Sequence, residues 1–294
     1  MITVVNAKIN IGLYILRRRP DGYHDLSTLF YPVGIKSGTP YSPYPFADIL
    51  EITPLPEADS HRFSFTGNRI DCPLEKNLVW KAVDIFGSCY LEKTGSPLPA
   101  YDIRLDKHIP DGAGLGGGSA DASFTIMLLN RLTGEPFSEK ELIEMASRLG
   151  ADCPFFILNR PAIAEGVGEI LRPVDFSLAG MWLVIVKPEF SISTKEAFAG
   201  IDCTRPHGQV STPLEFPMAD WKKSVFNEFE QHLFDLYPQL GAIKKMLYDG
   251  GASYAQMSGS GSAVFGLFGD EEAARKVCGE AGNTSGLYSA IIHL

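Results

Sequence analysis

The sequence predicts an α+β fold in two domains, and three observations support this prediction. The chain has 294 residues, which is long for one compact domain and comfortable for two. Hydrophobic residues make up 45% of it and charged residues 21%, the balance of a globular protein with a sizeable core. Strand-like and helix-like segments are mixed without the regular alternation of strand and helix that builds a doubly wound sheet.

The first half of the chain has apolar residues at alternate positions, which is typical of β-strands. Residues 2–16 alternate around Val4, Ile9 and Leu13 and predict a strand or a bent pair of strands. A polar turn follows at 17–22, where Asp-Gly permits positive φ. Further strands are expected at 27–33, 48–53, 62–66 and 101–109. Segment 36–46 contains three prolines, so we expect an irregular loop there.

Helices are predicted in the first half where apolar residues recur every three or four positions. Residues 77–91 have this spacing, and 119–132 form a buried helix closed by Gly134. Residues 138–149 begin with Ser138 and, three positions later, Glu141, which is the pattern of a capping box. The segment Gly-Ala-Asp-Cys-Pro at 150–154 ends this helix sharply.

A second half begins near Leu158 and has its own strands and helices. Strands are expected at 162–170, 181–186, 254–257, 263–268 and 288–294. Helices are expected at 221–248, with an interruption at Pro238, and at 271–280. We therefore predict one domain at 1–157 and a second at 158–294.

Charge and composition exclude several classes of protein. The net charge of −9 argues against a general nucleic-acid binder, which needs a broad basic face. The N-terminus lacks the pattern of a signal peptide, and the longest apolar runs are too short to cross a bilayer. The five cysteines lack CxxC spacing, which fits a reduced cytoplasm and gives no metal site. We expect a cytoplasmic enzyme with no nucleic-acid or membrane partner.

The strongest local signal is the glycine-rich segment IPDGAGLGGGSADAS at 109–123. Five glycines at 112–118 stand just before a predicted helix, where free amides and the helix dipole favour an anion. A flexible surface loop is the alternative, but such a loop does not usually run directly from a strand into an apolar helix. The segment is neither a Walker motif nor a dinucleotide fingerprint. It therefore predicts a phosphate-binding loop of another kind.

This segment resembles the central motif of the GHMP kinases, which are named for galactokinase, homoserine kinase, mevalonate kinase and phosphomevalonate kinase. Other motifs match the branch of that superfamily whose acceptor is 4-diphosphocytidyl-2-C-methyl-D-erythritol. They are NAKIN at 6–10, RPDGYH at 19–24, LGADCPFF at 149–156, AEGVGE at 164–169 and MSGSGSAVF at 257–265. The resemblance covers nearly the whole chain, and RPDGYH together with GADCPFF is more specific than the glycine loop.

The resemblance implies the two-domain GHMP kinase fold, with an N-terminal nucleotide-binding domain, a C-terminal α+β domain and the active site in the cleft between them. The implied reaction transfers the γ-phosphate of ATP to the 2-hydroxyl of the diphosphocytidyl substrate, in the mevalonate-independent route to isoprenoid precursors. The expected partners are these two small molecules. Mg²⁺ is expected with ATP, although its protein ligands cannot be assigned. Nothing in the sequence indicates the oligomeric state.

Lys8 and Asp152 match the catalytic pair of the family. Asp152 would accept the proton of the hydroxyl, while Lys8 offsets the developing negative charge. On local grounds alone, Asp152 is as readily a turn residue and Lys8 a solvated charge on a strand.

Binding residues are also carried over from the resemblance. Tyr23 and Phe198 are expected to stack on the cytosine from opposite sides, with His24 making hydrogen bonds to it. Thr194 and Asn10 are expected to contact the methylerythritol end. The residues expected to bind ATP are Asn77, Leu78, Lys107, Pro110, Asp111, Gly112, Ala113, Gly114, Leu115, Gly116, Gly117, Gly118, Ser119 and Ala120. Segment 258–263 reads locally as a tight turn, and the resemblance places it near the catalytic centre.

Two departures from the family pattern and three rival functions remain. Asp111 puts a negative charge where relatives often have a further glycine, and segment 36–46 is longer than is usual in the family. One rival is a GHMP kinase of the homoserine or mevalonate type, which RPDGYH disfavours because a small acceptor offers no base to stack. The others are a non-catalytic metabolite sensor of the same fold and a plain nucleotide-binding module.

Overall fold

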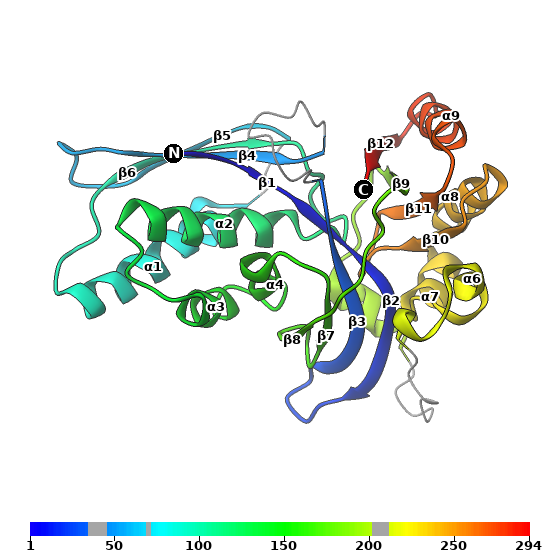
Figure 1. The fold of residues 1–294 in the computed structure, drawn as a ribbon, viewed down its shortest axis with the longest axis horizontal. Coiled ribbons are helices and arrows are strands. Elements are labelled where there is room, and N and C mark those ends of the chain that lie inside the picture. Colours follow the sequence, from blue (N-terminus) through cyan, green and yellow to red (C-terminus); the bar gives the residue numbers. More distant parts are fainter. Residues whose placement is uncertain (35–45, 69–71, 202–211) are drawn as a thin grey trace. The chain divides into compact units, whose positions relative to one another are not determined.

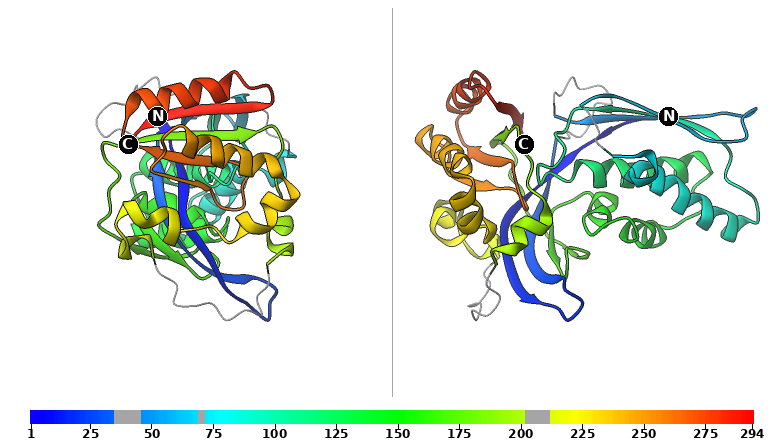
Figure 2. Two further views of the ribbon diagram at one scale, coloured as in Figure 1. Left: turned by 90° about the vertical axis from the view of Figure 1, so that its right-hand side faces the viewer. Right: turned by 180° about the vertical axis from the view of Figure 1, so that it is seen from behind.

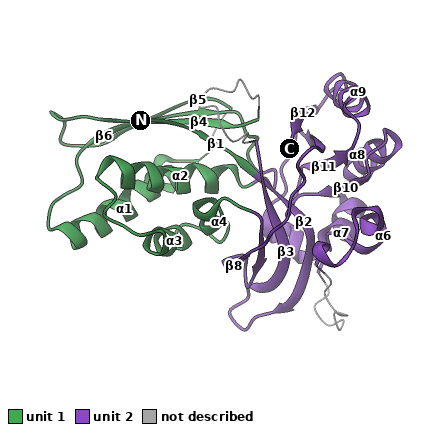
Figure 3. Ribbon diagram, in the orientation of Figure 1, with its two compact units in different colours: residues 1–7, 35–111, 116–160 green, residues 8–34, 112–115, 161–294 purple. Residues whose placement is uncertain are grey.

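The structure is a computed structural model that describes residues 1–34, 46–68, 72–201 and 212–294. The chain divides into two compact units (Figure 1 and Figure 3). Unit 1 comprises residues 1–7, 35–111 and 116–160, and unit 2 comprises residues 8–34, 112–115 and 161–294. Except for Phe46, the predicted loop 36–46 lies outside the described residues.

Unit 1 is built on a four-stranded sheet. Its strand order is β1 (Ile2–Val5), β4 (Asp48–Pro54), β6 (Tyr101–Lys107), β5 (Arg62–Gly67), and only the pairing of β5 with β6 is parallel. The α-helices in the described part of unit 1 are α1 (Leu78–Thr94), α2 (Gly117–Leu132), α3 (Glu139–Ser147) and α4 (Cys153–Leu158). Figure 1 shows the helices on one face of the sheet. Alternate residues of β6 are buried, so the strand turns one face of its side chains toward this helical layer.

The helix ends in unit 1 follow local sequence signals. The side chain of Asn77 accepts a hydrogen bond from the amide of Val79 and caps α1, which ends at Gly95 with φ 74°. Ser138 and Glu141 form the predicted capping box at the start of α3. The N-cap of α2 is Gly116, whose φ of 72° lies in the left-handed region that glycine tolerates. The predicted helix at 119–132 therefore begins two residues earlier, at Gly117.

The described residues of unit 2 form two four-stranded sheets. One has the order β2 (Ala7–Arg18), β3 (His24–Val33), β7 (Ala162–Glu165), β8 (Ile170–Pro173). The other has the order β10 (Tyr254–Met257), β11 (Val264–Phe268), β9 (Trp182–Pro188), β12 (Leu287–His293), with antiparallel pairs throughout. Helices α7 (Phe229–Leu236), α8 (Pro238–Asp249) and α9 (Glu271–Gly282) pack their apolar faces on the second sheet to form a continuous core (Figure 2).

Two predicted elements in unit 2 are wrong in detail. Residues 162–170 are not one strand, because Gly166 and Gly168 adopt positive φ and turn the chain into the hairpin of β7 and β8. The helix predicted at 221–248 is interrupted at Pro238, as expected, but also at a second place before it. The side chain of Asn227 bonds to the carbonyls of Met257 and Gly259, and this replaces helix between α6 (Trp221–Ser224) and α7.

Short elements missed by the periodicity complete the described fold. Helix α5 (Thr194–Ala199) is capped by Ser193, whose hydroxyl accepts from the amide of Glu196. Short 3₁₀ helices lie at Leu74–Lys76, Pro213–Glu215 and Met218–Asp220. The α+β prediction is confirmed. No helix in the described part of the chain is both long and apolar enough to span a bilayer. The predicted domain boundary at 157–158 stays a prediction, because compact units defined by contacts need not coincide with domains.

Candidate active site

Lys8 is held in a buried polar network at the start of β2. Its ammonium donates a 2.6 Å hydrogen bond to Oδ1 of Asn10 and lies 4.8 Å from the centre of the Phe30 ring. Nδ2 of Asn10 donates to the hydroxyl of Thr28 at 3.1 Å, and that hydroxyl donates to the Gly12 carbonyl at 2.5 Å. Lys8 and Asn10 are each 3% exposed. Lys8 is therefore not the solvated strand lysine that its local sequence allowed.

The first half of the glycine loop, residues 112–115, is bound through its carbonyl groups within unit 2. The Leu115 carbonyl accepts from the amide of Lys8, and the Gly114 carbonyl accepts from the hydroxyl of Ser258. The carbonyls of Ala113 and Gly112 accept from the amides of Ala263 and Ser262. These contacts join the glycine loop to the MSGSGSAVF segment, and the Ser258 hydroxyl also accepts from the amide of Asn10.

Packing explains why residue 114 is glycine. A Cβ at this position would lie 2.0 Å from the backbone carbonyl oxygen of Ser258, and its φ of 73° is in the left-handed region. The backbone of one loop therefore touches the backbone of the other, which fixes residues 112–115 tightly.

The second half of the glycine loop forms the start of α2 in unit 1. The first amides of an α-helix have no acceptor within the helix, so those of residues 117–119 can bind an anion. A Cβ at Gly118 would lie in ordinary contact, 3.8 Å from the side chain of Leu78. Leu78 and the N-terminus of α1 thus lie beside the start of α2, where the sequence predicted the adenine contacts.

Lys107, the last residue of β6, lies beneath the start of α2. Its ammonium bonds to a carboxylate oxygen of Asp48 and lies 2.9 Å from Oδ2 of Asp121. A Cβ at Gly117 would be 2.8 Å from this ammonium, so glycine is needed there to make room for Lys107. The side chain of Lys107 is only 4% exposed and is engaged by carboxylates of the protein.

Asp152 stands at the N-terminus of α4. It occupies the N-cap position, but its side chain makes no capping hydrogen bond. The following residue is anchored, because the Cys153 carbonyl accepts from the hydroxyl of Ser123 on α2 at 2.8 Å. The turn that carries Asp152 is thereby fixed to the helix that begins at the glycine loop, and the cap function does not account for its carboxylate.

Two of the residues predicted to bind cytosine lie together in unit 2. The rings of His24 and Phe198 stack with their centres 4.4 Å apart and an interplanar angle of 12°. Phe198 also meets the edge of Phe229 at 4.9 Å. Burial and the nearby charge of Arg18 lower the pKa of His24, so its imidazole is neutral at neutral pH. Tyr23, by contrast, is 66% exposed.

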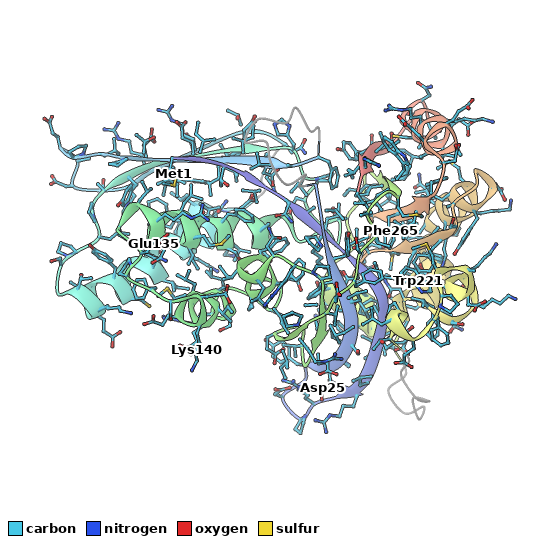
Figure 4. The ribbon with its side chains drawn as sticks, in the orientation of Figure 1. Met1, Asp25, Glu135, Lys140, Trp221 and Phe265 are labelled. Carbon is cyan, nitrogen blue, oxygen red and sulfur yellow. The ribbon has the colours of Figure 1, made fainter. Side chains whose placement is uncertain are left out.

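Asp25 lies next to the turn of the hairpin of β2 and β3, which carries Tyr23 and His24 (Figure 4). Its carboxylate accepts hydrogen bonds from the Nε atoms of both Arg17 and Arg19, and these bonds hold its pKa below the usual value. Arg19 also lies 3.8 Å from Glu169 in the AEGVGE turn, while the Leu26 amide donates to the Gly166 carbonyl. The RPDGYH and AEGVGE motifs are therefore in contact with each other.

Known proteins share both the sequence and the fold. The patterns of the GHMP kinases N terminal domain and the GHMP kinases C terminal match residues 77–160 and 218–284. The 4-diphosphocytidyl-2-C-methyl-D-erythritol kinase of Bacteroides fragilis is 47% identical over 96% of this chain and 97% of its own length. That of Parabacteroides distasonis is 44% identical over 91% of this chain and 92% of its own. The chain belongs to the 4-diphosphocytidyl-2-C-methyl-D-erythritol kinase family of the GHMP kinases.

A solved structure supports the same family. The crystal structure of a 4-(cytidine 5'-diphospho)-2C-methyl-D-erythritol kinase has a TM-score of 0.79 and 31% identity, with full coverage of both chains. The GHMP kinase fold predicted from the motifs is therefore confirmed.

Within this member of the kinase family, the structure groups the predicted site residues unevenly. Lys8 and Asn10 lie together in unit 2, and Leu78 lies beside Gly118 in unit 1. His24 and Phe198 touch, whereas the resemblance predicted that Phe198 and Tyr23 stack on opposite sides of the base. Thr194 is exposed as the first residue of α5. Asp111 is also exposed. The binding and catalytic roles assigned to all these residues stay predictions.

Several buried polar residues that contact the predicted site residues were not predicted from the sequence. Thr28, Asp48 and Asp121 are buried polar residues on β3, β4 and α2. Thr28 bonds to Asn10, and the two aspartates pair with Lys107. Asp121 lies inside the glycine-rich motif itself, directly after the residues assigned to ATP. The sequence did contain a signal for Asp121: it lies in a helix predicted to be buried, and a buried carboxylate needs a partner.

Proposed function

We propose that the chain transfers the γ-phosphate of ATP to the 2-hydroxyl of 4-diphosphocytidyl-2-C-methyl-D-erythritol, in the mevalonate-independent route to isoprenoid precursors. The observation that carries this proposal is the 47% identity to the 4-diphosphocytidyl-2-C-methyl-D-erythritol kinase of Bacteroides fragilis, over nearly the whole length of both chains. The chain keeps every motif on which the resemblance rests, from NAKIN to MSGSGSAVF.

ATP would bind with its phosphates at the start of α2. The amides of residues 117–119 and the positive end of the helix dipole favour an anion there. The tight attachment of residues 112–115 through their carbonyls supports this role, because a loop held on one side cannot collapse onto the phosphates. Leu78 would contact the adenine, and its position beside Gly118 supports this assignment.

The reaction forms a bond between the 2-hydroxyl oxygen and the γ-phosphorus and breaks the bond between that phosphorus and the leaving oxygen of ADP. The hydroxyl proton passes to the carboxylate of Asp152, whose side chain is not used as a helix cap. Lys8 offsets the negative charge that develops on the transferred group. Asn10 and Phe30 hold the Lys8 ammonium in one position, which such a role requires.

The cytidine end of the substrate would lie against the aromatic residues of unit 2. His24 and Phe198 are stacked on each other and only half-buried, so part of their ring surface remains for a pyrimidine, and the neutral imidazole of His24 can accept or donate one hydrogen bond to it. Exposed Tyr23 and Thr194 are free to contact the ligand from the hairpin and from α5. A small acceptor such as homoserine or mevalonate would leave these groups unused, so those rivals are disfavoured.

We expect Mg²⁺ to accompany ATP, since the ATP phosphates need a divalent counter-charge. Among the described residues there is no cluster of three His, Cys, Asp or Glu side chains that could hold a metal by themselves. A cytoplasmic location also stays a prediction.

The test is an ATP-consumption assay that compares the diphosphocytidyl substrate with homoserine and mevalonate. Turnover of the diphosphocytidyl substrate alone is expected, and a preference for either small acceptor would overturn the substrate assignment. Asp152→Asn should retain substrate binding and lose at least ~10²-fold in turnover. The matched control is Asp175→Asn, an exposed carboxylate outside the site, which should keep wild-type turnover. Binding of both ligands without turnover in the wild type would instead indicate a sensor.

A further inference from the structure

A group of three charged side chains lies buried beneath the glycine loop. Lys107 was predicted to contact ATP, but neither of its two aspartate partners has a role above. The Lys107 ammonium bridges the carboxylates of Asp48 on β4 and Asp121 on α2. The exposed fractions of these side chains are 4%, 0% and 3%. With both carboxylates ionised, the group would carry one net negative charge in the interior, which is costly.

The two carboxylates are not equivalent, and this decides where a proton would reside. Oδ1 of Asp48 accepts hydrogen bonds from the amides of His108 and Ile109, at 2.6 and 2.7 Å, which stabilise its charge. Oδ1 of Asp121 is buried and has no hydrogen-bond partner among the described residues. An ionised oxygen left in that position would lack both water and a donor. Asp121 is therefore the better place for the proton.

Electrostatics agree with this geometry. Burial raises the pKa of Asp121 to about 8, although the charge of Lys107 opposes the rise, and the Asp48 carboxylate raises it further. Lys107 and Asp48 exert the strongest charge effects on Asp121. Helices α1, α3 and α4 also pack on α2. Cys153 of α4 faces Ser119 and Ser123. Burial raises the pKa of the Cys153 thiol to about 11, so this thiol is neutral. At neutral pH the Asp121 carboxyl is thus protonated.

This group touches the loop that would bind ATP. A Cβ at Gly117, the first residue of α2, would lie 2.8 Å from the Lys107 ammonium. The ammonium therefore packs directly against the backbone whose amides are proposed to meet the phosphates. Any change in the net charge of the group acts on a bound anion across this single layer of backbone, in surroundings of low dielectric constant.

We propose that Asp121 is a proton-carrying positioning residue for ATP binding. With its proton, the Asp48–Lys107–Asp121 group is neutral, anchors α2 to β4 and β6, and leaves the positive end of the helix available to phosphate. Without the proton, which passes to solvent, the group carries one negative charge beneath the loop, and ATP binds more weakly. ATP binding at alkaline pH then draws a proton from solvent onto Asp121. This inference rests on the proposed binding of ATP at the loop.

The first experiment measures the dissociation constant of ATP from about pH 7 to about pH 9.5 in the whole protein. The wild-type constant is expected to rise at least ~3-fold above pH 8, and at most ~10-fold per pH unit because one proton is involved. ATP itself does not titrate in this range, since phosphate groups lose their last proton near pH 6. Asp121→Asn has nearly the same shape and cannot ionise, so its dissociation constant for ATP should show no rise with pH, whatever its value at pH 7.

The matched control is Asp102→Asn, on the same strand as Lys107, whose carboxylate pairs with Arg104 at the surface. It should keep the wild-type pH profile. A wild-type profile in Asp121→Asn, or a flat profile in the wild type, would overturn the proposal. Loss of ATP affinity in Asp121→Asn at every pH, with the slope retained, would show a role in structure alone.

The second experiment needs no variant and so does not depend on whether Asp121→Asn folds. Calorimetric titration of ATP at about pH 8.5 in buffers of different ionisation enthalpy gives the number of protons taken up. Net uptake by the wild type is expected, and none would contradict the proposal. If ATP fails to bind at any pH, the proposed function fails; if it binds without proton uptake, only the role of Asp121 fails.

Discussion

The Lys8 ammonium donates a hydrogen bond to Oδ1 of Asn10, two residues further along the same strand. Alternate residues of a strand share a face, so this pair is set by the backbone of β2. The other end of the Asn10 amide donates to Thr28. Both ends of this amide are thus bonded within the protein, which makes Asn10 a residue that positions Lys8, in addition to any contact with substrate.

Asn10→Ala is therefore expected to lower kcat by about 10- to 100-fold, because the Lys8 ammonium loses its fixed position. KM for the diphosphocytidyl substrate should change less than kcat. Steady-state kinetics of the variant gives both constants. Thr28→Ser, which keeps the hydroxyl that accepts from Asn10, is the control and should behave as the wild type. A large rise in KM with normal kcat would instead identify Asn10 as a substrate contact.

The glycines of the loop are expected to respond differently to the same substitution. Gly114→Ala should lower Tm, since its Cβ would lie 2.0 Å from a backbone oxygen at positive φ. Gly118→Ala meets only the Leu78 side chain at 3.8 Å and should fold normally.

Gly118→Ala then tests phosphate binding separately from folding. A methyl group at the start of α2 should weaken ATP binding by about 10-fold and leave the cytidine ligand unaffected. Thermal unfolding and titration of both ligands measure these effects. Unchanged ATP affinity in a folded Gly118→Ala would show that the phosphates lie elsewhere. Gly117 is unsuitable for this purpose because a side chain there would displace Lys107.

Much of the fold could be predicted from local sequence signals. The capping box of Ser138 and Glu141 and the alternation in β6 are encoded within a few residues, so their prediction was confirmed. The break before α7 could not be predicted in this way. It depends on bonds from Asn227 to carbonyls some thirty residues away along the chain. The turn that divides 162–170 was encoded in Gly-Val-Gly, but the apolar alternation concealed it.

The site shows the same division. The phosphate loop could be predicted because closely spaced glycines directly before a helix are typical of loops that bind phosphate. The buried Asp48–Lys107–Asp121 group could not, because its two aspartates are 59 and 14 residues from Lys107 along the chain and meet it only through the pairing of β4 with β6 and the packing of α2. The sequence predicted Lys107 as an ATP contact, whereas its ammonium is engaged by two carboxylates.

Acid should destabilise unit 1 through Glu141. Lys93 donates to its carboxylate at 2.5 Å and Ser138 donates through both its amide and hydroxyl, which lowers the pKa of Glu141 to about 2. Because this pKa is depressed from about 4.5, the stabilisation is complete above pH 4.5 and is lost as pH falls toward 2. Glu141→Gln should therefore be less stable than the wild type at pH 7, and the difference should shrink between about pH 4.5 and pH 3.

Urea unfolding of both proteins at each pH measures this difference. Glu144→Gln, an exposed glutamate on the same helix, serves as the control and should show little difference at any pH. A difference between Glu141→Gln and wild type that stays constant with pH would mean that the carboxylate charge contributes nothing.

The last prediction concerns the cytidine ligand and decides which rings bind it. Phe198 stacks on His24 at 4.4 Å, while Tyr23 is exposed on the adjacent turn. If the pyrimidine stacks on an aromatic ring, replacing that ring by Leu keeps some burial and removes roughly 0.5–1.5 kcal/mol. Phe198→Leu and Tyr23→Leu should each raise the dissociation constant of the diphosphocytidyl ligand about 2- to 13-fold and leave that of ATP unchanged.

Phe176→Leu is the matched control, because its ring stacks on Trp221 and has no predicted ligand contact. Titration of each variant with both ligands gives the result directly. Weakening by Phe198→Leu alone would show that the base stacks on one ring, with Tyr23 remaining in solvent. If ATP affinity falls in parallel, the variant is impaired in folding and does not test the stacking contact. If neither variant weakens the cytidine ligand, aromatic stacking does not select the substrate, and the pyrimidine must be recognised by hydrogen bonds such as those available to His24.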